Sequence, residues 1–164
     1  MQGLHLTADL RGCLPALSSA LSPALSPALT SSLSSSLSPM HEPEALRALC
    51  LAAVAGAGLQ AVGELFHRFP APGGVTGVVL LAESHLAVHT WPELDGVTLD
   101  VYVCNLNGDN SARAEAMLAA LEAAFSPSSA ERHRLQRGGP APGQPVMTPA
   151  RAARGAGARR GSAR

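Results

Sequence analysis

Apolar and polar residues alternate along much of this chain, and the period of the alternation predicts the secondary structure. Residues 3–10 alternate with period two, as a strand with one buried face does. Residues 75–82 are almost all apolar, which predicts a strand covered on both faces. Pro and Gly bound the other strand-like runs, which cover residues 59–69, 85–91, 97–104 and, as a short last strand, 131–136.

Two segments have the 3.6-residue period of an amphipathic helix. In residues 42–56, Pro43 suits the first turn, the acidic residues beside it suit the positive end of the helix dipole, and glycines follow the last turn. Cys50 lies on or beside the apolar stripe of this helix, which indicates a small buried residue. In residues 110–125, Asn110 or Ser111 can cap the N-terminus.

The order of these elements predicts the fold class. Consecutive strands with short connections favour an antiparallel sheet, and two helices suffice to cover one of its faces. We therefore expect a two-layer α+β sandwich with both helices on one face. The other face then needs a cover, for which a second copy of the chain is the simplest candidate.

Two segments differ from the rest in composition. Residues 14–40 are rich in Ser, Pro and Ala, with a Leu at every fourth position from 17 to 37. Because prolines interrupt this stripe, we interpret it as a disordered surface insertion, with a Leu-rich partner-binding segment as the alternative. Residues 137–164 contain Gly, Ala, Pro and Arg but no acidic residue, which is typical of a disordered tail. The expected domain is thus 1–136.

Charge and cysteine content exclude several classes of function. The formal net charge is zero, so nothing draws the chain toward nucleic acid or a membrane surface. Three cysteines are too few and odd in number for a disulfide framework. Residues 1–13 lack the apolar core of a signal peptide, and no run is long enough to span a bilayer. We expect a cytoplasmic protein.

Reactive side chains are concentrated between Gly73 and Asn105. Ser84 stands between two polar residues at a strand boundary, and composition alone favours the interpretation of Glu83-Ser84-His85 as a turn between two strands. A metal site made by His85, His89 and Cys104, with His67 nearby, is another alternative. We expect no metal, because this spacing is not a recognised ligand pattern.

The segment AESHLAVHTWPE, followed by DVYVCN, resembles the short bacterial and archaeal S-adenosylmethionine decarboxylases. HLTADLRGC near the start and LFHRF…GGVTGVV before the site belong to the same resemblance, which extends from Gly3 to Phe125 apart from the insertion. These are pyruvoyl enzymes that cleave themselves at a Glu-Ser bond. The resemblance implies products 1–83, the β chain, and 84–164, the α chain.

The resemblance also implies roles for individual residues. The hydroxyl of Ser84 attacks the carbonyl of Glu83, and Ser84 becomes the pyruvoyl group. His89 is the base that removes a proton so that the resulting ester eliminates, and Thr76 helps to stabilise the processing intermediate. Cys104 is the proton donor of the decarboxylation.

The implied substrate is S-adenosylmethionine, and the product supplies aminopropyl groups for spermidine synthesis. Phe69 and Trp91 resemble adenine-stacking positions, and Glu93 resembles a ligand of the ribose hydroxyls. The family suggests a homodimer of cleaved protomers. A pyruvoyl decarboxylase of ornithine or arginine and an inactive regulatory subunit are the alternatives.

The composition independently favours a pyruvoyl group. Decarboxylation of an amino acid needs an electron sink, and pyridoxal phosphate, the common one, is normally anchored by a Lys. This chain has no Lys, and all its basic residues except His are Arg. A keto group made from the backbone would supply the sink instead, and a thiol such as that of Cys104, mostly protonated at neutral pH, would return the proton.

The hairpin of residues 85–104 allows a geometric prediction. With a turn centred on Leu94, paired positions sum to about 188, so that Cys104 lies opposite Ser84 with about 5 Å between their Cβ atoms. His89 is an odd number of residues from Ser84 and would face the other side of a regular strand. We therefore expect an irregularity at residues 83–86 that brings the two together.

Overall fold

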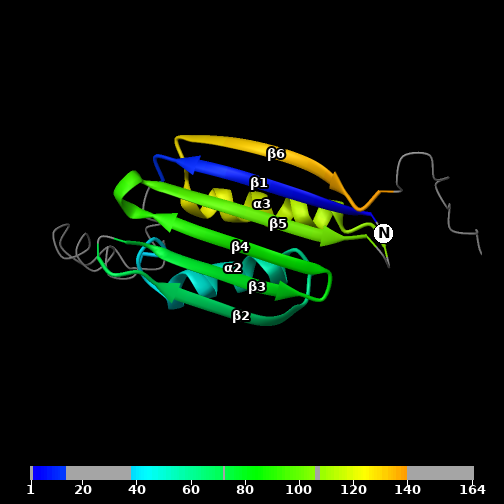
Figure 1. The fold of residues 1–164 in the computed structure, drawn as a ribbon, viewed down its shortest axis with the longest axis horizontal. Coiled ribbons are helices and arrows are strands. Elements are labelled where there is room, and N and C mark those ends of the chain that lie inside the picture. The colour runs from blue at the N-terminus through cyan, green and yellow to red at the C-terminus, as the bar shows by residue number, and fades with distance from the viewer. Residues whose placement is uncertain (1, 14–37, 72, 106–107, 140–164) are drawn as a thin grey trace, which may run out of the picture.

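The computed structural model describes residues 2–13, 38–71, 73–105 and 108–139. Its six strands form one antiparallel sheet in the order β2-β3-β4-β5-β1-β6 (Figure 1). The strands are β1 (Gly3–Arg11), β2 (Ala61–Arg68), β3 (Val75–Leu81), β4 (Ser84–Trp91), β5 (Gly96–Cys104) and β6 (Ser129–Arg137). The helices are α2 (Pro43–Gly56), α3 (Ser111–Phe125) and the single 3-10 turn η1 (Pro92–Leu94).

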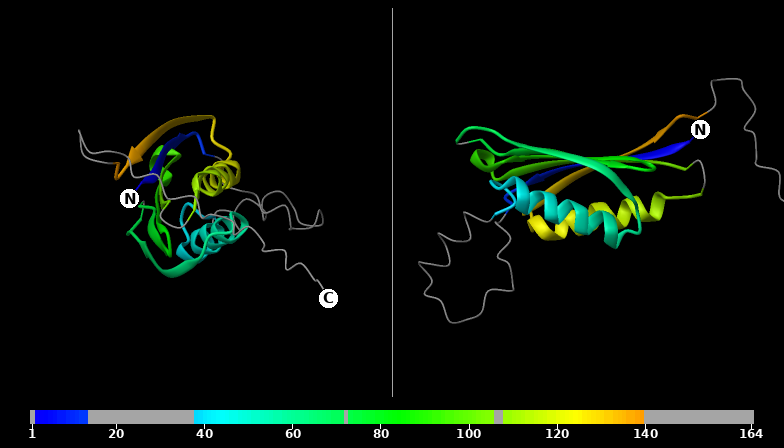
Figure 2. Two further views of the ribbon diagram at one scale, coloured as in Figure 1. Left: turned by 90° about the vertical axis from the view of Figure 1, so that its right-hand side faces the viewer. Right: turned by 90° about the horizontal axis from the view of Figure 1, so that it is seen from below.

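Both long helices lie on one face of the sheet, which confirms the predicted two-layer α+β sandwich (Figure 2). Alternation along β1 buries Leu4, Leu6, Ala8 and Leu10 against the helices. The helices bury the apolar stripes that their sequences predict, including Leu46, Cys50, Ala53 and Val54 of α2 and Met117, Leu118, Leu121 and Phe125 of α3. Every predicted element is present, and β6 is longer than the predicted 131–136.

On the opposite face of the sheet, here called the open face, no helix of the described residues lies over the strands (Figure 2). On β3, the buried positions alternate with Thr76 and Val78, which are half-buried, and Leu80, which is 50% exposed. The prediction that residues 75–82 are covered on both faces is therefore wrong for a single chain. The reason is topological, because both crossover helices pack on the same side.

The segment just before α2 belongs to the folded domain. Ser38 and Met40 are buried, and the Thr90 hydroxyl donates a hydrogen bond to the Met40 carbonyl over 2.8 Å. The predicted insertion of residues 14–40 therefore ends too late, and its remaining residues, 14–37, lie outside the described part of the chain. The predicted tail begins too early, since Arg137 still pairs with Gly3 of β1; residues 140–164 are not described.

The β4–β5 hairpin differs by one residue from the predicted register. Ser84 pairs with Val103 and Trp91 with Gly96, so paired positions sum to 187 rather than 188. The loop holds four residues, because the turn of η1 is followed by Asp95 in the left-handed conformation at φ 47° and ψ 39°. An even loop length places the pairing axis between Glu93 and Leu94 instead of on Leu94.

The expected irregularity at residues 83–86 is not found. Ala82 and Glu83 form a two-residue turn, and β4 pairs without interruption from Ser84 onward with both β3 and β5. One consequence is a fixed alternation, in which Leu86, Val88 and Thr90 face the helices while His85 and His89 face the open side.

No helix among the described residues combines the length and the apolar character needed to cross a membrane.

Candidate active site

Ser84 and Cys104 meet at one end of the sheet, which is the right-hand end in Figure 1. Ser84 is half-buried and is the first residue of β4, directly after the tight turn at Glu83. Cys104 is the last residue of β5, and its backbone N–H donates a hydrogen bond to the Glu83 carbonyl over 2.9 Å. The Cys104 carbonyl in turn accepts a hydrogen bond from the Asn110 side chain over 3.0 Å.

The Glu83 carbonyl is the group that a Ser84 hydroxyl would attack. A backbone N–H fixed 2.9 Å from its oxygen polarises the carbonyl and can hold the negative charge that forms there during attack. Within the described residues, Glu83 Oε2 is buried and has no hydrogen-bond partner. The turn therefore places a polarised carbonyl, and a carboxylate with one buried oxygen that lacks a partner, directly before Ser84.

Thr76 and His89 form a second pair, located nearer the opposite end of the sheet. They are cross-strand neighbours on β3 and β4, and Thr76 Oγ1 lies 2.7 Å from His89 Nδ1 in a hydrogen bond. His89 is exposed on the open face. The hydroxyl fixes the orientation of the imidazole and leaves Nε2 available to a group outside the chain.

The aromatic residues lie at the same end as His89. Phe69 and Trp91 are 47% and 45% exposed, and together with His89 and Glu93 they line a cavity of about 260 Å³. The aromatic rings and the Glu93 carboxylate are suited to a ligand that has an apolar ring and hydroxyl groups. The structure thus brings together Phe69, Trp91 and Glu93, and His89 is beside them.

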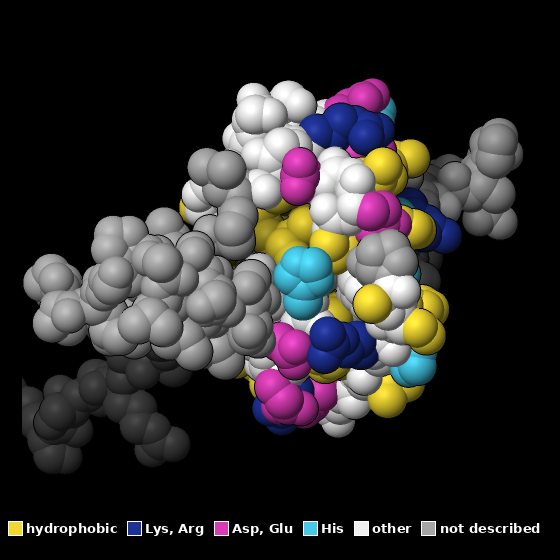
Figure 3. Space-filling model, turned by 90° about the vertical axis from the view of Figure 1, so that its left-hand side faces the viewer, with side chains coloured by type: hydrophobic (Ala, Val, Ile, Leu, Met, Phe, Trp, Pro, Cys, Tyr) yellow, Lys and Arg dark blue, Asp and Glu magenta, His cyan; other side chains and the backbone are white. Residues whose placement is uncertain are grey.

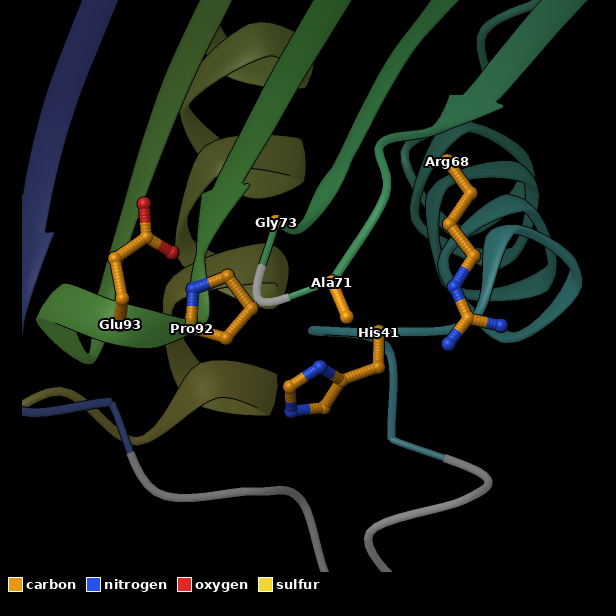
Figure 4. A pocket seen from close by; sticks show the side chains of 6 residues that line it. All are labelled: His41, Arg68, Ala71, Gly73, Pro92 and Glu93. Carbon is orange, nitrogen blue, oxygen red and sulfur yellow. The ribbon is translucent and has the colours of Figure 1, made fainter.

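A neighbouring pocket of about 310 Å³ shares Gly73 and Glu93 with this cavity. In Figure 4, His41 and Arg68 approach it from one side and Pro92 and Glu93 from the other. Viewed from this end, the surface has a hollow with apolar side chains at its centre and acidic, basic and histidine side chains around it (Figure 3). Arg68 Nη1 is 2.9 Å from Glu42 Oε1, so its charge is already paired.

Within one chain, Ser84 and His89 are not brought together. They are five residues apart on a regular strand, which corresponds to about 16 Å, and alternation directs them to opposite faces. Trp91 is farther still from Ser84. Each chain therefore presents two half-sites, one with Ser84 and Cys104 and the other with Thr76, His89 and the aromatic cavity.

The remaining cysteines do not contribute to either half-site. Burial raises the pKa of the Cys50 thiol to about 12. Burial, followed by the negative charge of Asp95, also raises the pKa of Cys13. The prediction that Cys50 is a small buried residue is confirmed. Over the described ranges, no three His, Cys, Asp or Glu side chains are grouped in a way that could hold a metal ion.

Three residues that the sequence analysis did not group together lie side by side on the open face. Asp100 of β5 stands between His5 of β1 and His85 of β4, with His5 Nε2 2.8 Å from Oδ2 and His85 Nε2 3.3 Å from Oδ1. Ser84 Oγ is 3.3 Å from His85 Nδ1. Alternation could have assigned all three to one face, but only the pairing of β1 with β5 makes them neighbours.

Comparison with known proteins identifies the family of this chain. A sequence model of the S-adenosylmethionine decarboxylase family matches residues 32–138. The chain is 42% identical to the S-adenosylmethionine decarboxylase proenzyme of Archaeoglobus fulgidus over 58% of its own length and 80% of that protein. It is 33% identical to the Hydrogenobaculum proenzyme over 83% of its length and 81% of that protein.

A solved structure extends the comparison to three dimensions. The crystal structure of the adenosylmethionine decarboxylase from Aquifex aeolicus superimposes with a TM-score of 0.63 at 31% identity, covering 83% of this chain and 90% of that one. The chain therefore belongs to the S-adenosylmethionine decarboxylase family. Proteins of this family are carboxy-lyases, and the relatives above are proenzymes by name.

Proposed function

We propose that this chain is a self-cleaving proenzyme that decarboxylates S-adenosylmethionine with a pyruvoyl group made from Ser84. The observation that carries the proposal is the turn at Glu83, where the Cys104 N–H holds the carbonyl before Ser84 over 2.9 Å. The residues fit the group, since a serine follows a polarised carbonyl and the sequence has no Lys to anchor an alternative.

The processing steps use one water and side chains of this sequence, with His89 supplied by a second copy of the chain. Ser84 Oγ attacks the Glu83 carbonyl carbon, and cleavage of the C–N bond leaves an ester. His89 then takes the Cα proton of Ser84, and the Glu83 carboxylate leaves from Cβ. Water replaces the nitrogen, which departs as ammonia. The products are residues 1–83 and a chain from position 84 that begins with the pyruvoyl group.

In the decarboxylation, the pyruvoyl group supplies the electron sink for the carbanion that remains when CO2 leaves. Cys104, half-buried beside Glu83, donates the proton that returns to the substrate Cα. Phe69 and Trp91 flank the adenine, and Glu93 accepts hydrogen bonds from the ribose hydroxyls. The product, decarboxylated S-adenosylmethionine, serves spermidine synthesis in the cytoplasm.

We further propose that two chains form a homodimer through their open faces. The roughly 16 Å between Ser84 and His89 of one chain supports this arrangement, because processing needs both in contact with one residue. Apolar residues exposed on the open face also support it, among them Leu65 at 70% and Leu80 at 50% exposure. His89, Thr76 and the aromatic cavity of one protomer would then face the Ser84 half-site of its partner.

Intact mass measurement under denaturing conditions tests the proposal. We expect two chains that separate between Glu83 and Ser84, the second lighter by one ammonia than a fragment starting with serine. The S84A variant, as the matched control, should remain a single chain. A wild-type chain that stays uncut at full mass would contradict the proposal and favour an inactive partner subunit.

The substrate requires a separate assay. CO2 release should be observed with S-adenosylmethionine and not with ornithine or arginine, because the latter two lack the ring that the Phe69 and Trp91 cavity accommodates. Trp91→Ala should raise KM by about 10-fold or more, since loss of a stacking partner costs about 1–3 kcal/mol. Equal turnover of ornithine would identify a different pyruvoyl decarboxylase.

A further inference from the structure

A line of polar side chains on the open face leads from Arg137 to His85, which contacts the Ser84 hydroxyl at the start of β4. Arg137 Nη1 lies 3.3 Å from His5 Nδ1, and Asp100 stands between His5 and His85. The line ends at His85, whose Nδ1 is 3.3 Å from Ser84 Oγ. Neither the processing steps nor the decarboxylation described above assign a role to His5, His85 or Asp100.

Arg137 sets the direction of the hydrogens along this line. A guanidinium can only donate, so His5 Nδ1 must accept, and the hydrogen of a neutral His5 is on Nε2, facing Asp100 Oδ2 at 2.8 Å. A carboxylate, by contrast, can only accept a hydrogen bond. The hydrogen of a neutral His85 therefore belongs on Nε2, which is 3.3 Å from Asp100 Oδ1. His85 Nδ1 then carries a lone pair that can accept the hydrogen of the Ser84 hydroxyl.

The packing keeps the two histidines at Asp100. The Tyr102 ring is tilted against both imidazoles, with centroids 5.6 Å from His5 and 5.8 Å from His85, and Arg137 lies 5.2 Å above the same ring. Among the described residues, His5 Nε2 and Asp100 Oδ1 are buried and have no hydrogen-bond partner of good geometry. The polar group nearest to each is the one given above, Asp100 Oδ2 for His5 and His85 Nε2 for Asp100 Oδ1. The half-exposed Asp100 carboxylate thus lies between the two imidazoles, one against each of its oxygens.

We propose that His85 is the base that activates Ser84 for its attack on Glu83, and that Asp100 and His5 are positioning residues for it. This inference rests on the proposed self-cleavage and assigns its first step. His89 lies on the open face, about 16 Å from Ser84 along β4, and acts in the later elimination.

The step balances without any further reagent. As Ser84 Oγ bonds to the Glu83 carbonyl carbon, His85 Nδ1 takes the hydroxyl proton, and Asp100 stabilises the imidazolium that forms. The Cys104 N–H, 2.9 Å from the Glu83 oxygen, stabilises the oxyanion. When the C–N bond breaks, His85 returns the proton to the Ser84 nitrogen. An amide is exchanged for an ester, with no change of oxidation state.

Hydroxylamine distinguishes the proposed roles of His85 and His89, because it cleaves an ester, which forms before the His89 step, much faster than an amide. Wild-type, H85Q, H89A and H133Q chains are followed by intact mass from synthesis onward, with and without hydroxylamine. His133 is the matched control, since it is exposed on the same face and, within the part of the chain that is described, its ion-pair partner is Glu131. H133Q should process at the wild-type rate.

The expected results differ in kind for the two variants. Uncut H85Q chain should accumulate and resist hydroxylamine, with cleavage slowed about 100-fold, the usual contribution of a general base. Uncut H89A chain should accumulate as the ester and be cut by hydroxylamine at position 84. D100N should behave as a milder H85Q, about 10-fold slower, and D100E should recover part of the rate, which a merely structural role would not predict.

Two outcomes would overturn the inference. H85Q chain that processes at the wild-type rate would remove His85 from the reaction, and H85Q chain that hydroxylamine cuts would assign it to a step after ester formation. Thermal unfolding of H85Q and D100N confirms that each variant is folded before rates are compared. A wild-type chain that never cleaves would instead refute the proposed function, and the inference would fall with it.

Discussion

At the scale of single residues, burial separates the three cysteines of the chain. Cys50 is fully buried in α2 and Cys13 is 4% exposed, whereas Cys104 is half-buried at the end of β5. Reactivity of a thiol depends on access and on the thiolate form, and burial suppresses both. Cys104 is thus the cysteine available for chemistry in the folded chain.

Alkylation of the folded protein at pH 8 should therefore label Cys104 first and leave Cys50 unmodified until the chain unfolds. Peptide masses after timed iodoacetamide treatment measure this. The pKa of Cys50 rises on folding from an ordinary value of 9.0 to about 12, so its protonated thiol contributes stability fully below pH 9, and that contribution is lost as pH rises toward 12. Labelling of Cys50 and Cys104 at equal rates would contradict this ordering.

At the scale of elements, the Thr90 hydroxyl joins three segments that are far apart in sequence. It accepts a hydrogen bond from the Val75 N–H over 2.7 Å and donates one to the Met40 carbonyl over 2.8 Å. Thr90 is 4% exposed, so water does not replace these partners. This contact holds the segment before α2 against β3 and β4, directly beside His89 and Trp91.

Replacing Thr90 by Val keeps the shape but leaves the Val75 N–H and the Met40 carbonyl unpaired in the core. We expect the free energy of unfolding to fall by about 2–4 kcal/mol, since each buried unpaired group costs about 1–3 kcal/mol. Chemical denaturation measures the loss. Thr90→Ser, which retains the hydroxyl, should lose clearly less; equal losses for both variants would show that the methyl group and not the hydroxyl matters.

The elements themselves were predictable because each has a local signal. Period-two alternation identified β1, and the apolar stripe with Pro43 at its start identified α2. The register of the β4–β5 hairpin was not predictable, since it depends on whether the turn holds an odd or even number of residues. A difference of one residue in the length of the turn decides whether Ser84 pairs with Val103 or with Cys104 across the sheet.

At the scale of the whole molecule, the separation of the two half-sites makes a dimer testable by complementation. An H89A chain keeps Ser84, and an S84A chain keeps His89. If the site is shared, H89A chain should be cut only when it is co-expressed with S84A, at up to half the wild-type extent if the chains pair at random. Intact mass of the mixture checks this, and H89A alone is the control. Cleavage of H89A alone would show that the partner supplies nothing.

Disruption of the open face should prevent both assembly and processing. Leu65 is 70% exposed on this face, and a Leu65→Glu change would bury a charge in the proposed interface. Light scattering coupled to size exclusion should then give a monomer, and the chain should remain uncut. Ala52→Glu, at an exposed position of α2, is the matched control and should stay dimeric. A cleaved L65E monomer would refute the shared site.

The sequence by itself determined the fold class and the order and type of the elements, because alternation and motif are properties of contiguous segments. It also identified Ser84, His89 and Cys104 as candidates through a resemblance. Only the tertiary structure decided that Ser84 and His89 are held apart, and that His5, Asp100 and His85 lie together. The first fact depends on the regularity of β4, and the second depends on strand order and register, which are set by packing between distant segments and by the length of one turn.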